Sequence, residues 1–207
     1  MRGDHPASAR ARRNNCKSVE RKTRSTPIPD QPIFALEDVA SVPTRPLPAK
    51  PGILVQIDTI HDGPHDNRLY SYTMLDVCSR WAYTLPTERV TSYRSLQFVN
   101  GARRALPCTI RTLQSDHGSA FSKWFTKQVA RRGIAHRHSR IRTPNDNAHL
   151  ERFYRMIQEQ CINRVPRRLA AWHREIPDYL EWYNERRPHI GLKMKSPIDI
   201  INAVPRY

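Results

Sequence analysis

Residues 53–60, Ile-Leu-Val-Gln-Ile-Asp-Thr-Ile, decide the class of fold. Their side chains alternate, with Ile53, Val55 and Ile57 on one face and Asp58 among those on the other. A period of two residues predicts a β-strand that is packed against a core. A carboxylate within such an apolar strand costs free energy unless it is paired or binds a metal ion. Asp58 is therefore the first candidate site residue, with a salt bridge to one of the many arginines as the alternative reading.

Two more strands are expected directly after the first. A turn cluster at 63–67 leads to a strand at 68–77, and a third strand is expected at 81–85. Three sequential strands with short connections predict an antiparallel meander. After the third strand the apolar residues repeat with the spacing of an α-helix. This helix is expected to have Ser92 as its N-cap and to end at Pro107.

Strands and helices alternate in the second half of the chain. A strand at 109–113, a helix at 119–132 and a strand at 134–138 predict a parallel pairing with a right-handed crossover. A helix that starts at 143–146 then carries an apolar stripe of Leu150, Phe153, Tyr154, Ile157 and Cys161. Two shorter helical pieces separated near Pro177 follow. The predicted fold class is α/β, a mixed sheet flanked by helices.

The chain is strongly basic, which favours an acidic polymer as its partner. Its 207 residues include 35 Lys and Arg against 19 Asp and Glu, a formal charge of +16. No apolar run is long enough to cross a membrane, and the start of the chain lacks a signal-peptide pattern. The four cysteines show no zinc-binding spacing and are read as reduced thiols. A cytoplasmic protein without a membrane or a small-molecule substrate is expected.

Residues 1–50 differ in composition from the rest. Of the 17 prolines, 8 fall within residues 1–51, together with the basic run Arg10-Ala-Arg12-Arg13. Such a segment buries too little apolar surface to pack, so 1–50 is expected to be a disordered arm or linker. A DNA-contacting arm and a solvated linker both remain open. Residues 51–207 are expected to form the folded part, with a C-terminal helical extension.

Two further carboxylates are placed so that they could join Asp58. Asp116 directly follows a predicted strand, and Glu151 lies on a flank of the long helix together with Asn147, Arg155 and Gln158. Three converging carboxylates are hard oxygen ligands, suited to Mg²⁺ or Mn²⁺ and not to zinc. Two such ions could clamp the attacking and leaving oxygens of a phosphoryl displacement. Basic side chains would hold the polyanionic backbone.

The motifs around these carboxylates resemble a known family. Asp58 in Val-Gln-Ile-Asp-Thr, Asp116 in Gln-Ser-Asp-His-Gly-Ser-Ala-Phe and Glu151 in Asn-Ala-His-Leu-Glu-Arg-Phe are similar to the DDE triad of the integrase catalytic core. Retroviral integrases and bacterial insertion-sequence transposases share this core. The resemblance runs from about Pro51 to Pro197, and the tail Trp-Tyr-Asn-Glu-Arg-Arg-Pro-His at 182–189 resembles that of the transposases.

The resemblance implies an RNase H-like fold with a mixed five-stranded sheet, and a triad that binds two Mg²⁺ or Mn²⁺ ions. It implies cleavage and strand transfer of a mobile element, double-stranded DNA as partner, a homo-oligomer and a place on the bacterial nucleoid. Related enzymes carry DNA-facing side chains where Arg155 and Gln158 stand. Arg140 and Arg142 flank the expected active-site loop, where DNA contact and plain solvation are both open.

Two alternative functions remain at this point. One is an inactive DNA-binding remnant of a transposase, favoured by the absence from 1–50 of the helical periodicity of a helix-turn-helix domain. The chain is therefore expected to be short at its N-terminus. The other is an RNase H-like nuclease that uses the same metals with water as the only nucleophile.

Overall fold

A computed structural model describes residues 48–64, 68–140 and 147–204. The predicted arm at 1–50 lies outside these ranges except for its last three residues, as do the predicted helix start at 143–146 and Arg142. The boundary proposed near residue 50 is therefore not tested by the structure.

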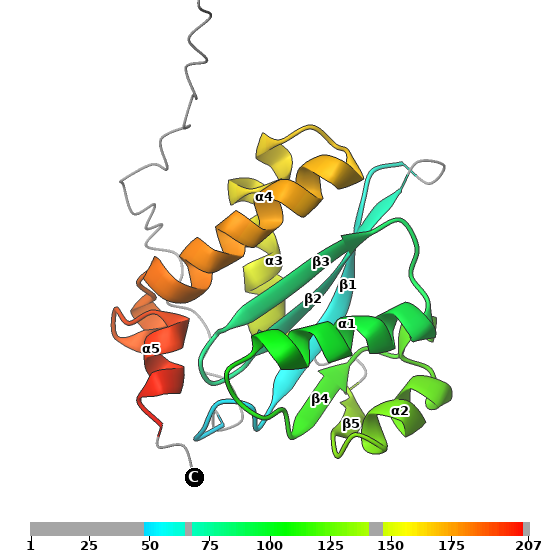
Figure 1. Cartoon of the computed structure of the whole chain (residues 1–207), viewed down its shortest axis with the longest axis horizontal. Helices are drawn as coiled ribbons and strands as arrows, with labels where there is room; N and C mark the ends of the chain where they lie inside the picture. The colour runs from blue at the N-terminus through cyan, green and yellow to red at the C-terminus, as the bar shows by residue number, and fades with distance from the viewer. Residues whose placement is uncertain (1–47, 65–67, 141–146, 205–207) are drawn as a thin grey trace, which may run out of the picture. The chain divides into compact units, whose positions relative to one another are not determined.

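The described residues form the expected mixed sheet (Figure 1). Its five strands are β1 Val55–Asp62, β2 Leu69–Asp76, β3 Ala82–Thr87, β4 Thr112–Ser115 and β5 Ala135–His138. Their order in space is β3-β2-β1-β4-β5. The first three strands pair antiparallel, whereas β1–β4 and β4–β5 pair parallel. The α/β class and the five-stranded RNase H-like sheet are confirmed.

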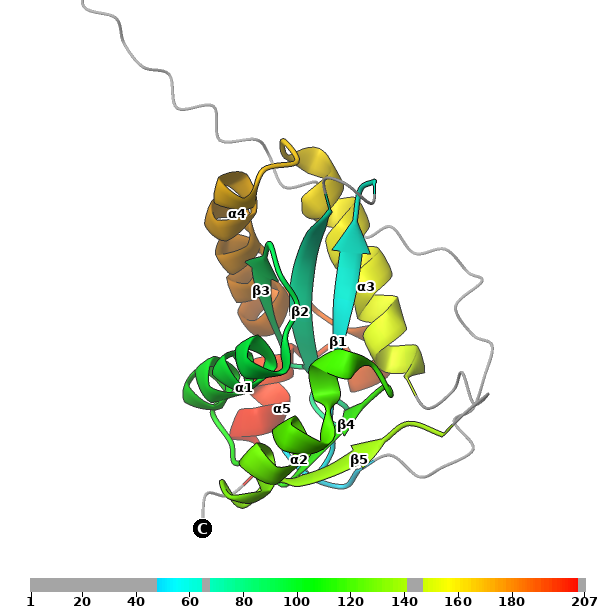
Figure 2. The ribbon, with the colours of Figure 1, turned by 90° about the vertical axis from the view of Figure 1, so that its right-hand side faces the viewer.

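Helices cover both faces of the sheet (Figures 1 and 2). The α-helices are α1 Ser92–Ala105, α2 Lys123–Ala130, α3 Ala148–Gln160, α4 Leu169–Glu181 and α5 Pro197–Asn202. Short 3-10 helices span Ser119–Phe121, Ile162–Arg164 and Ile190–Leu192, and a π-helix spans Trp182–Arg186. Helix α1 lies on the face opposite α3 and α4, so each face has its own apolar core.

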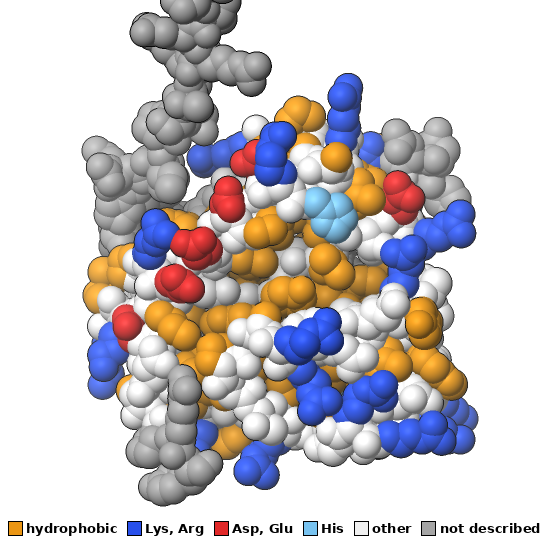
Figure 3. All heavy atoms as spheres, viewed as in Figure 1, with side chains coloured by type: hydrophobic (Ala, Val, Ile, Leu, Met, Phe, Trp, Pro, Cys, Tyr) orange, Lys and Arg blue, Asp and Glu red, His pale blue; other side chains and the backbone are white. Residues whose placement is uncertain are grey.

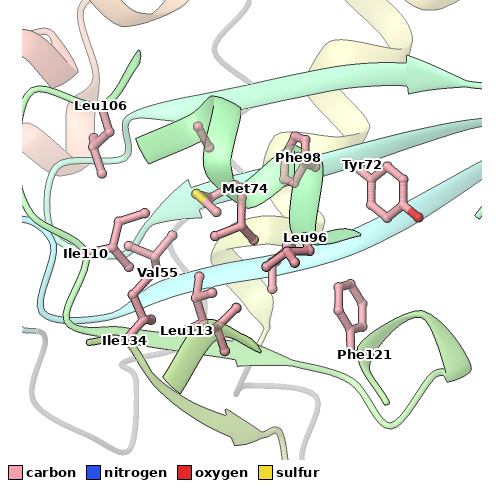
Figure 4. Packing of buried hydrophobic residues seen from close by; sticks show 14 of the residues in the cluster. Val55, Tyr72, Met74, Leu96, Phe98, Leu106, Ile110, Leu113, Phe121 and Ile134 are labelled. Carbon is pink, nitrogen blue, oxygen red and sulfur yellow. The ribbon is translucent and has the colours of Figure 1, made fainter. Parts of the chain in front are cut away.

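The core beneath α1 and α2 is built from alternate strand residues (Figure 4). Val55 and Ile57 of β1 and Tyr72 and Met74 of β2 point into it, as the period of two predicts. Beneath α3 and α4, the second core collects side chains that face the other way. Its buried members are Leu69, Leu75, Ala82, Leu150, Phe153, Ile157, Cys161, Ile162, Trp172, Ile176, Leu180 and Tyr183.

The start of α1 differs from the prediction by one residue. Thr91, not Ser92, is the N-cap, because its hydroxyl accepts a hydrogen bond from the Arg94 N–H at 3.2 Å. The Ser92 hydroxyl instead donates to the Ser119 carbonyl at 3.0 Å and so ties α1 to the segment after β4. The prediction failed because both residues are good caps and sequence does not choose between them.

The elements after α1 are shorter than predicted. Strand β4 begins at Thr112 rather than at 109, because the Arg111 N–H bonds to Gly52 outside the ladder. The predicted helix at 119–132 is a 3-10 turn followed by α2, which starts after the N-cap Ser122. Arg131, not Gly133, is the C-cap of α2, and Gly133 has φ +74°, a left-handed conformation that glycine adopts freely, in the turn that leads to β5.

The predicted break at Pro177 is absent, and α4 runs through it as one helix. Proline lacks an N–H and so removes one intrahelical hydrogen bond. Pro177 lies on the exposed side of α4. The opposite side buries Trp172, Ile176 and Leu180 against the sheet. This packing outweighs the lost hydrogen bond.

The π-helix fastens the C-terminal part to the edge strand β3. The Asn184 Oδ1 accepts from the Ala82 N–H and its Nδ2 donates to the Ala82 carbonyl, both at 2.8 Å. Asn184 thus pairs with the backbone of β3 as a neighbouring strand would. The Trp-Tyr-Asn motif therefore has a structural role at the edge of the sheet.

Basic side chains are distributed over several elements. Figure 3 shows Lys and Arg side chains scattered around a face on which hydrophobic side chains gather between α1 and α4. The positive charge predicted from composition therefore extends to the folded part and is not confined to one stripe.

Candidate active site

Strands β1 and β4 bring Asp58 and Asp116 to the same level of the sheet. The strands pair parallel, and the register sets Gln56 opposite Gln114. Asp58 and Asp116 each lie two residues beyond these glutamines. Asp116 directly follows the last residue of β4, so both carboxylates belong to the region where the β1–β4 ladder ends.

Helix α3 places Glu151 in its first turn. Leu150, Phe153 and Ile157 bury the apolar stripe of the helix, as predicted, and leave Glu151 exposed beside it. At the start of the helix the Gln114 side chain donates to the Asn147 Oδ1 at 3.1 Å. This bond ties the beginning of α3 to β4 next to Asp116.

Both other candidate carboxylates act on the pKa of Asp58. Burial, with a smaller contribution from the Asp116 and Glu151 charges, raises the pKa of Asp58 from 3.8 to about 6. The Thr59 N–H, which donates to the Asp58 Oδ1 at 2.7 Å, acts in the opposite direction on this pKa. Asp116 and Glu151 therefore lie near enough to Asp58 to act on its charge, and their joint role in one site stays a prediction.

Tyr154 is a site residue that the sequence did not reveal. Its hydroxyl is buried and finds no hydrogen-bond partner within the described residues. Burial, followed by the charges of Asp58, Asp116 and Glu151, raises the pKa of the Tyr154 phenol well above its usual value. Tyr154 was assigned to the apolar stripe. Its position one helical turn after Glu151 is the signal that could have identified it.

The segment that carries Asp116 is held by its own backbone and by histidines. The Asp116 Oδ1 accepts from the Gly118 N–H at 3.0 Å. The His138 Nδ1 lies 2.6 Å from the Asp116 carbonyl, and the His117 ring stacks on His138 at 4.7 Å. Ser115, the last residue of β4, contacts His136 Nε2 at 3.0 Å. These contacts fix the backbone from which the Asp116 carboxylate projects.

The predicted DNA-binding residues have different surroundings. Arg155 is exposed and Gln158 half-buried, one and two turns beyond Glu151 on α3. Asn147 is engaged with Gln114, as described above, and Arg140 is exposed after β5. Arg142 lies outside the described residues. Their contact with DNA stays a prediction.

Two features are absent from the described residues. No group of three or more His, Cys, Asp or Glu side chains is arranged to hold a metal ion as the structure stands. In the same ranges, no helix combines the length and the apolar character that crossing a bilayer requires.

Comparison with known proteins identifies the domain that this geometry builds. Two models, each described as an integrase core domain, match residues 48–144 and 132–197 and so together span the sheet and the helices around it. The chain belongs to the integrase core family. The resemblance that the motifs suggested is therefore confirmed, and all three carboxylates fall within the matched residues.

Individual relatives of this integrase core come from viruses and insertion sequences. The chain is 22% identical over 178 residues to integrase ORF3 of Spiroplasma virus SpV1-C74, covering 73% of this chain and 48% of that protein. It is 34% identical over 90 residues to the transposase for insertion sequence element IS904 of Lactococcus lactis, and this alignment covers 42% of this chain and 36% of that protein. The chain thus spans about half the length or less of these two relatives.

Solved structures show the same fold. The HTLV-2 integrase catalytic core domain in complex with magnesium aligns in its trimeric form with a TM-score of 0.58 and 19% identity, covering 73% of this chain and 97% of that one. The dimeric form of that domain aligns with a TM-score of 0.59 and 18% identity, and the alignment covers 74% of this chain and 98% of that one. At this identity the comparison establishes the fold.

Proposed function

We propose that this chain is a DDE polynucleotidyl transferase that cleaves DNA and joins 3′-hydroxyl ends of a mobile element to target DNA. The observation that carries the proposal is that Asp58 and Asp116 lie where the β1–β4 ladder ends, with Glu151 of α3 near enough to act on the Asp58 pKa, in a chain of the integrase core family. A related transposase and related viral proteins support the same function. Residues 51–207 would be the catalytic core with a C-terminal helical extension, acting on the bacterial nucleoid.

The three carboxylates fit a pair of divalent cations. All are oxygen donors, which suit Mg²⁺ or Mn²⁺. The raised pKa of Asp58 reflects burial beside like charges, a cost that a bound cation would remove. Since the present arrangement is not a closed ligand group, the three side chains would have to approach one another on binding. When bound, two ions would activate the attacking oxygen and stabilise the departing 3′-oxygen.

The chain's own residues would position the nucleic acid. Arg155 and Gln158 extend from α3 beyond Glu151, and Arg155 is exposed, so they could contact the backbone near the scissile phosphate. Asn147, Arg140 and Arg142 are the other proposed contacts. The Tyr154 hydroxyl, which has no hydrogen-bond partner among the described residues, could donate to one of these carboxylates and orient it.

The partners follow from this chemistry. Double-stranded DNA, as element end and as target, is the proposed substrate, and the net charge of +16 favours it. The related HTLV-2 core is described in dimeric and trimeric forms, which supports a homo-oligomer here.

The proposal is tested with the purified chain, Mg²⁺, a labelled duplex carrying a 3′-hydroxyl end and a supercoiled plasmid. Wild type should join the labelled strand to the plasmid, whereas Asp58→Asn should abolish joining and leave DNA binding largely intact. Glu159→Gln is the matched control, because this exposed carboxylate lies on α3 outside the site. It should join at the wild-type rate.

Three outcomes separate the candidate functions. Joining that depends on Mg²⁺ and on Asp58 supports the strand transferase. Cleavage without joining would identify an RNase H-like nuclease instead. DNA binding with neither reaction would identify the inactive remnant, and joining by Asp58→Asn at the wild-type rate would remove Asp58 from the site.

A further inference from the structure

A buried glutamine connects the sheet to the helix that carries Glu151. Gln114 lies on β4, two residues before Asp116, and is only 2% exposed although its amide is polar. Its neighbour Leu113 packs in the core beneath α1, so Gln114 points to the other face of the sheet, where α3 lies. A buried amide costs free energy unless its polar atoms are hydrogen-bonded. The partners of Gln114 therefore indicate what the residue does.

Both polar atoms of the Gln114 amide are hydrogen-bonded, and in one defined orientation. The Oε1 accepts from the Arg137 Nε at 2.9 Å, and the Nε2 donates to the Asn147 Oδ1 at 3.1 Å. Arg137 stands beside Gln114 in the parallel register of β4 and β5. Because a guanidinium group can only donate, the amide oxygen must face Arg137, which leaves the amide nitrogen to face Asn147. Gln114 thus links β4 to β5 and to the start of α3.

Asn147 gives up its usual role in order to make this bond. It is the N-cap of α3, a position where the asparagine side chain commonly accepts a hydrogen bond from the first turn of the helix. Among the described residues, the Asn147 side chain makes no such capping bond, and its Oδ1 accepts from Gln114 instead. Its backbone carbonyl accepts from the Glu151 N–H at 3.0 Å. The start of α3 is therefore bonded to the sheet rather than capped by its own first residue.

These contacts form a continuous path to Glu151. Three consecutive hydrogen bonds join Arg137 to Gln114, Gln114 to Asn147, and Asn147 to Glu151. Strand β4 itself leads directly into Asp116. The path therefore fixes a carboxylate on the helix relative to a carboxylate at the end of the strand. Groups that orient metal ligands in this way typically change metal affinity or activity by about 10- to 100-fold when they are replaced.

We propose that Gln114 is a positioning residue, which holds the first turn of α3 through Asn147 so that Glu151 can share divalent cations with Asp58 and Asp116. The inference rests on the proposed function and extends it to a residue that acts through another side chain. The competing explanation is that the bond between Gln114 and Asn147 only stabilises the folded chain. The two explanations differ in whether metal affinity changes independently of stability.

Two variants remove the bond in different ways. Gln114→Met keeps the length of the side chain but removes both polar atoms. Asn147→Ser supplies another preferred N-cap residue, so α3 can be capped, but the serine hydroxyl is one atom too short to reach Gln114. Gln97→Met is the matched control, because Gln97 is exposed on α1, on the opposite face of the sheet.

The first measurement is the binding of Mn²⁺ to the full chain without DNA, followed by the EPR signal of the free ion. Gln114→Met and Asn147→Ser should each raise the Kd for Mn²⁺ about tenfold, whereas Gln97→Met should match wild type. Urea denaturation should show that Asn147→Ser is as stable as wild type, so its loss of affinity would not reflect unfolding. Wild-type affinity for Mn²⁺ in both variants would leave only the stabilising role and overturn the proposal.

The double variant tests whether the two residues act through one bond. Gln114→Met combined with Asn147→Ser should have the Kd of either single variant, because the second change removes a bond that is already broken. A Kd raised about a hundredfold, the product of two tenfold effects, would show that the residues act separately and would overturn the proposal. If Gln114→Met fails to fold, Asn147→Ser decides alone, since Asn147 is only half-buried.

Further measurements separate this inference from the proposed function. Strand transfer is assayed in parallel, and a wild type that binds Mn²⁺ as expected but joins no DNA would refute strand transfer and leave the positioning role standing. If wild type binds no Mn²⁺, the proposed metal site fails, and hydrogen exchange of the Glu151 amide measured by NMR decides. Exchange about fivefold faster in Gln114→Met would retain Gln114 as the residue that positions Glu151. Unchanged exchange would overturn that role.

Discussion

Replacement of Asp58 by Asn should stabilise the metal-free protein while it destroys activity. The pKa of Asp58 is raised from 3.8 to about 6, chiefly by burial, so the folded state holds this proton more tightly than the unfolded chain does. The ionised carboxylate therefore opposes folding. This penalty is absent below about pH 3.8, grows as the pH rises towards 6, and is fully present at pH 7.5.

The size of the effect follows from the shift in pKa. Each unit corresponds to about 1.4 kcal/mol, so the full shift is worth about 3 kcal/mol, and solvent screening of this half-buried group reduces it to about 1–3 kcal/mol. Asn keeps the oxygen that accepts from the Thr59 N–H and loses only the charge. The free energy of unfolding of Asp58→Asn should exceed that of wild type by this amount.

Urea denaturation at pH 7.5 measures the difference. In EDTA, Asp58→Asn should be the more stable protein, and the exposed control Glu159→Gln should match wild type within about 0.5 kcal/mol. Added Mg²⁺ should raise the stability of wild type and not that of Asp58→Asn. If Asp58→Asn is equal to or less stable than wild type in EDTA, then Asp58 is not strained by its neighbours and the reasoning fails.

Four further changes test other parts of the structure. Asn184→Ala leaves the Ala82 N–H and carbonyl without their partners, so urea denaturation should show a loss of about 2–4 kcal/mol, with a loss below 1 kcal/mol contradicting the structural role of the Trp-Tyr-Asn motif. Tyr154→Phe should leave stability unchanged or raised but slow joining, and unchanged joining would exclude the hydroxyl from the site. Arg155→Ala should lower the salt slope of DNA affinity by about one on every duplex, and a loss confined to one sequence would argue against a phosphate contact. Burial lowers the pKa of His189 from 6.5 to about 4, so the folded state favours the neutral ring. The stability that the neutral His189 ring contributes should be complete above pH 6.5 and be lost as the pH falls towards 4. Denaturation curves of His189→Gln should show less of this acid sensitivity.

Much of the fold was predictable because its signals are local. The alternation from Ile53 onward and the helical stripe of Leu150, Phe153 and Ile157 each reflect one buried face, and the structure confirms them. Pro177 shows where local reasoning fails. The poor helix propensity of proline predicts a break at this residue. The helix stays continuous because α4 packs on the sheet, and no local sequence pattern reveals that packing.

The candidate site was predictable only in part. Asp58 stood out because a carboxylate contradicts its apolar strand, and Asp116 and Glu151 followed from their motifs. Tyr154 was missed because an aromatic residue within an apolar stripe indicates core, and only the structure shows that its hydroxyl has no hydrogen-bond partner in the described part of the chain and that the carboxylates act on its pKa.

A crystal structure of the full chain soaked in Mn²⁺, with anomalous scattering measured at the manganese edge, tests the metal site most directly. Two anomalous peaks about 4 Å apart should lie among the carboxylates of Asp58, Asp116 and Glu151. Asp58→Asn crystals treated alike should lose at least one of them. Ordered carboxylates more than about 10 Å apart, or manganese bound only at other residues, would contradict two-metal catalysis by these three residues.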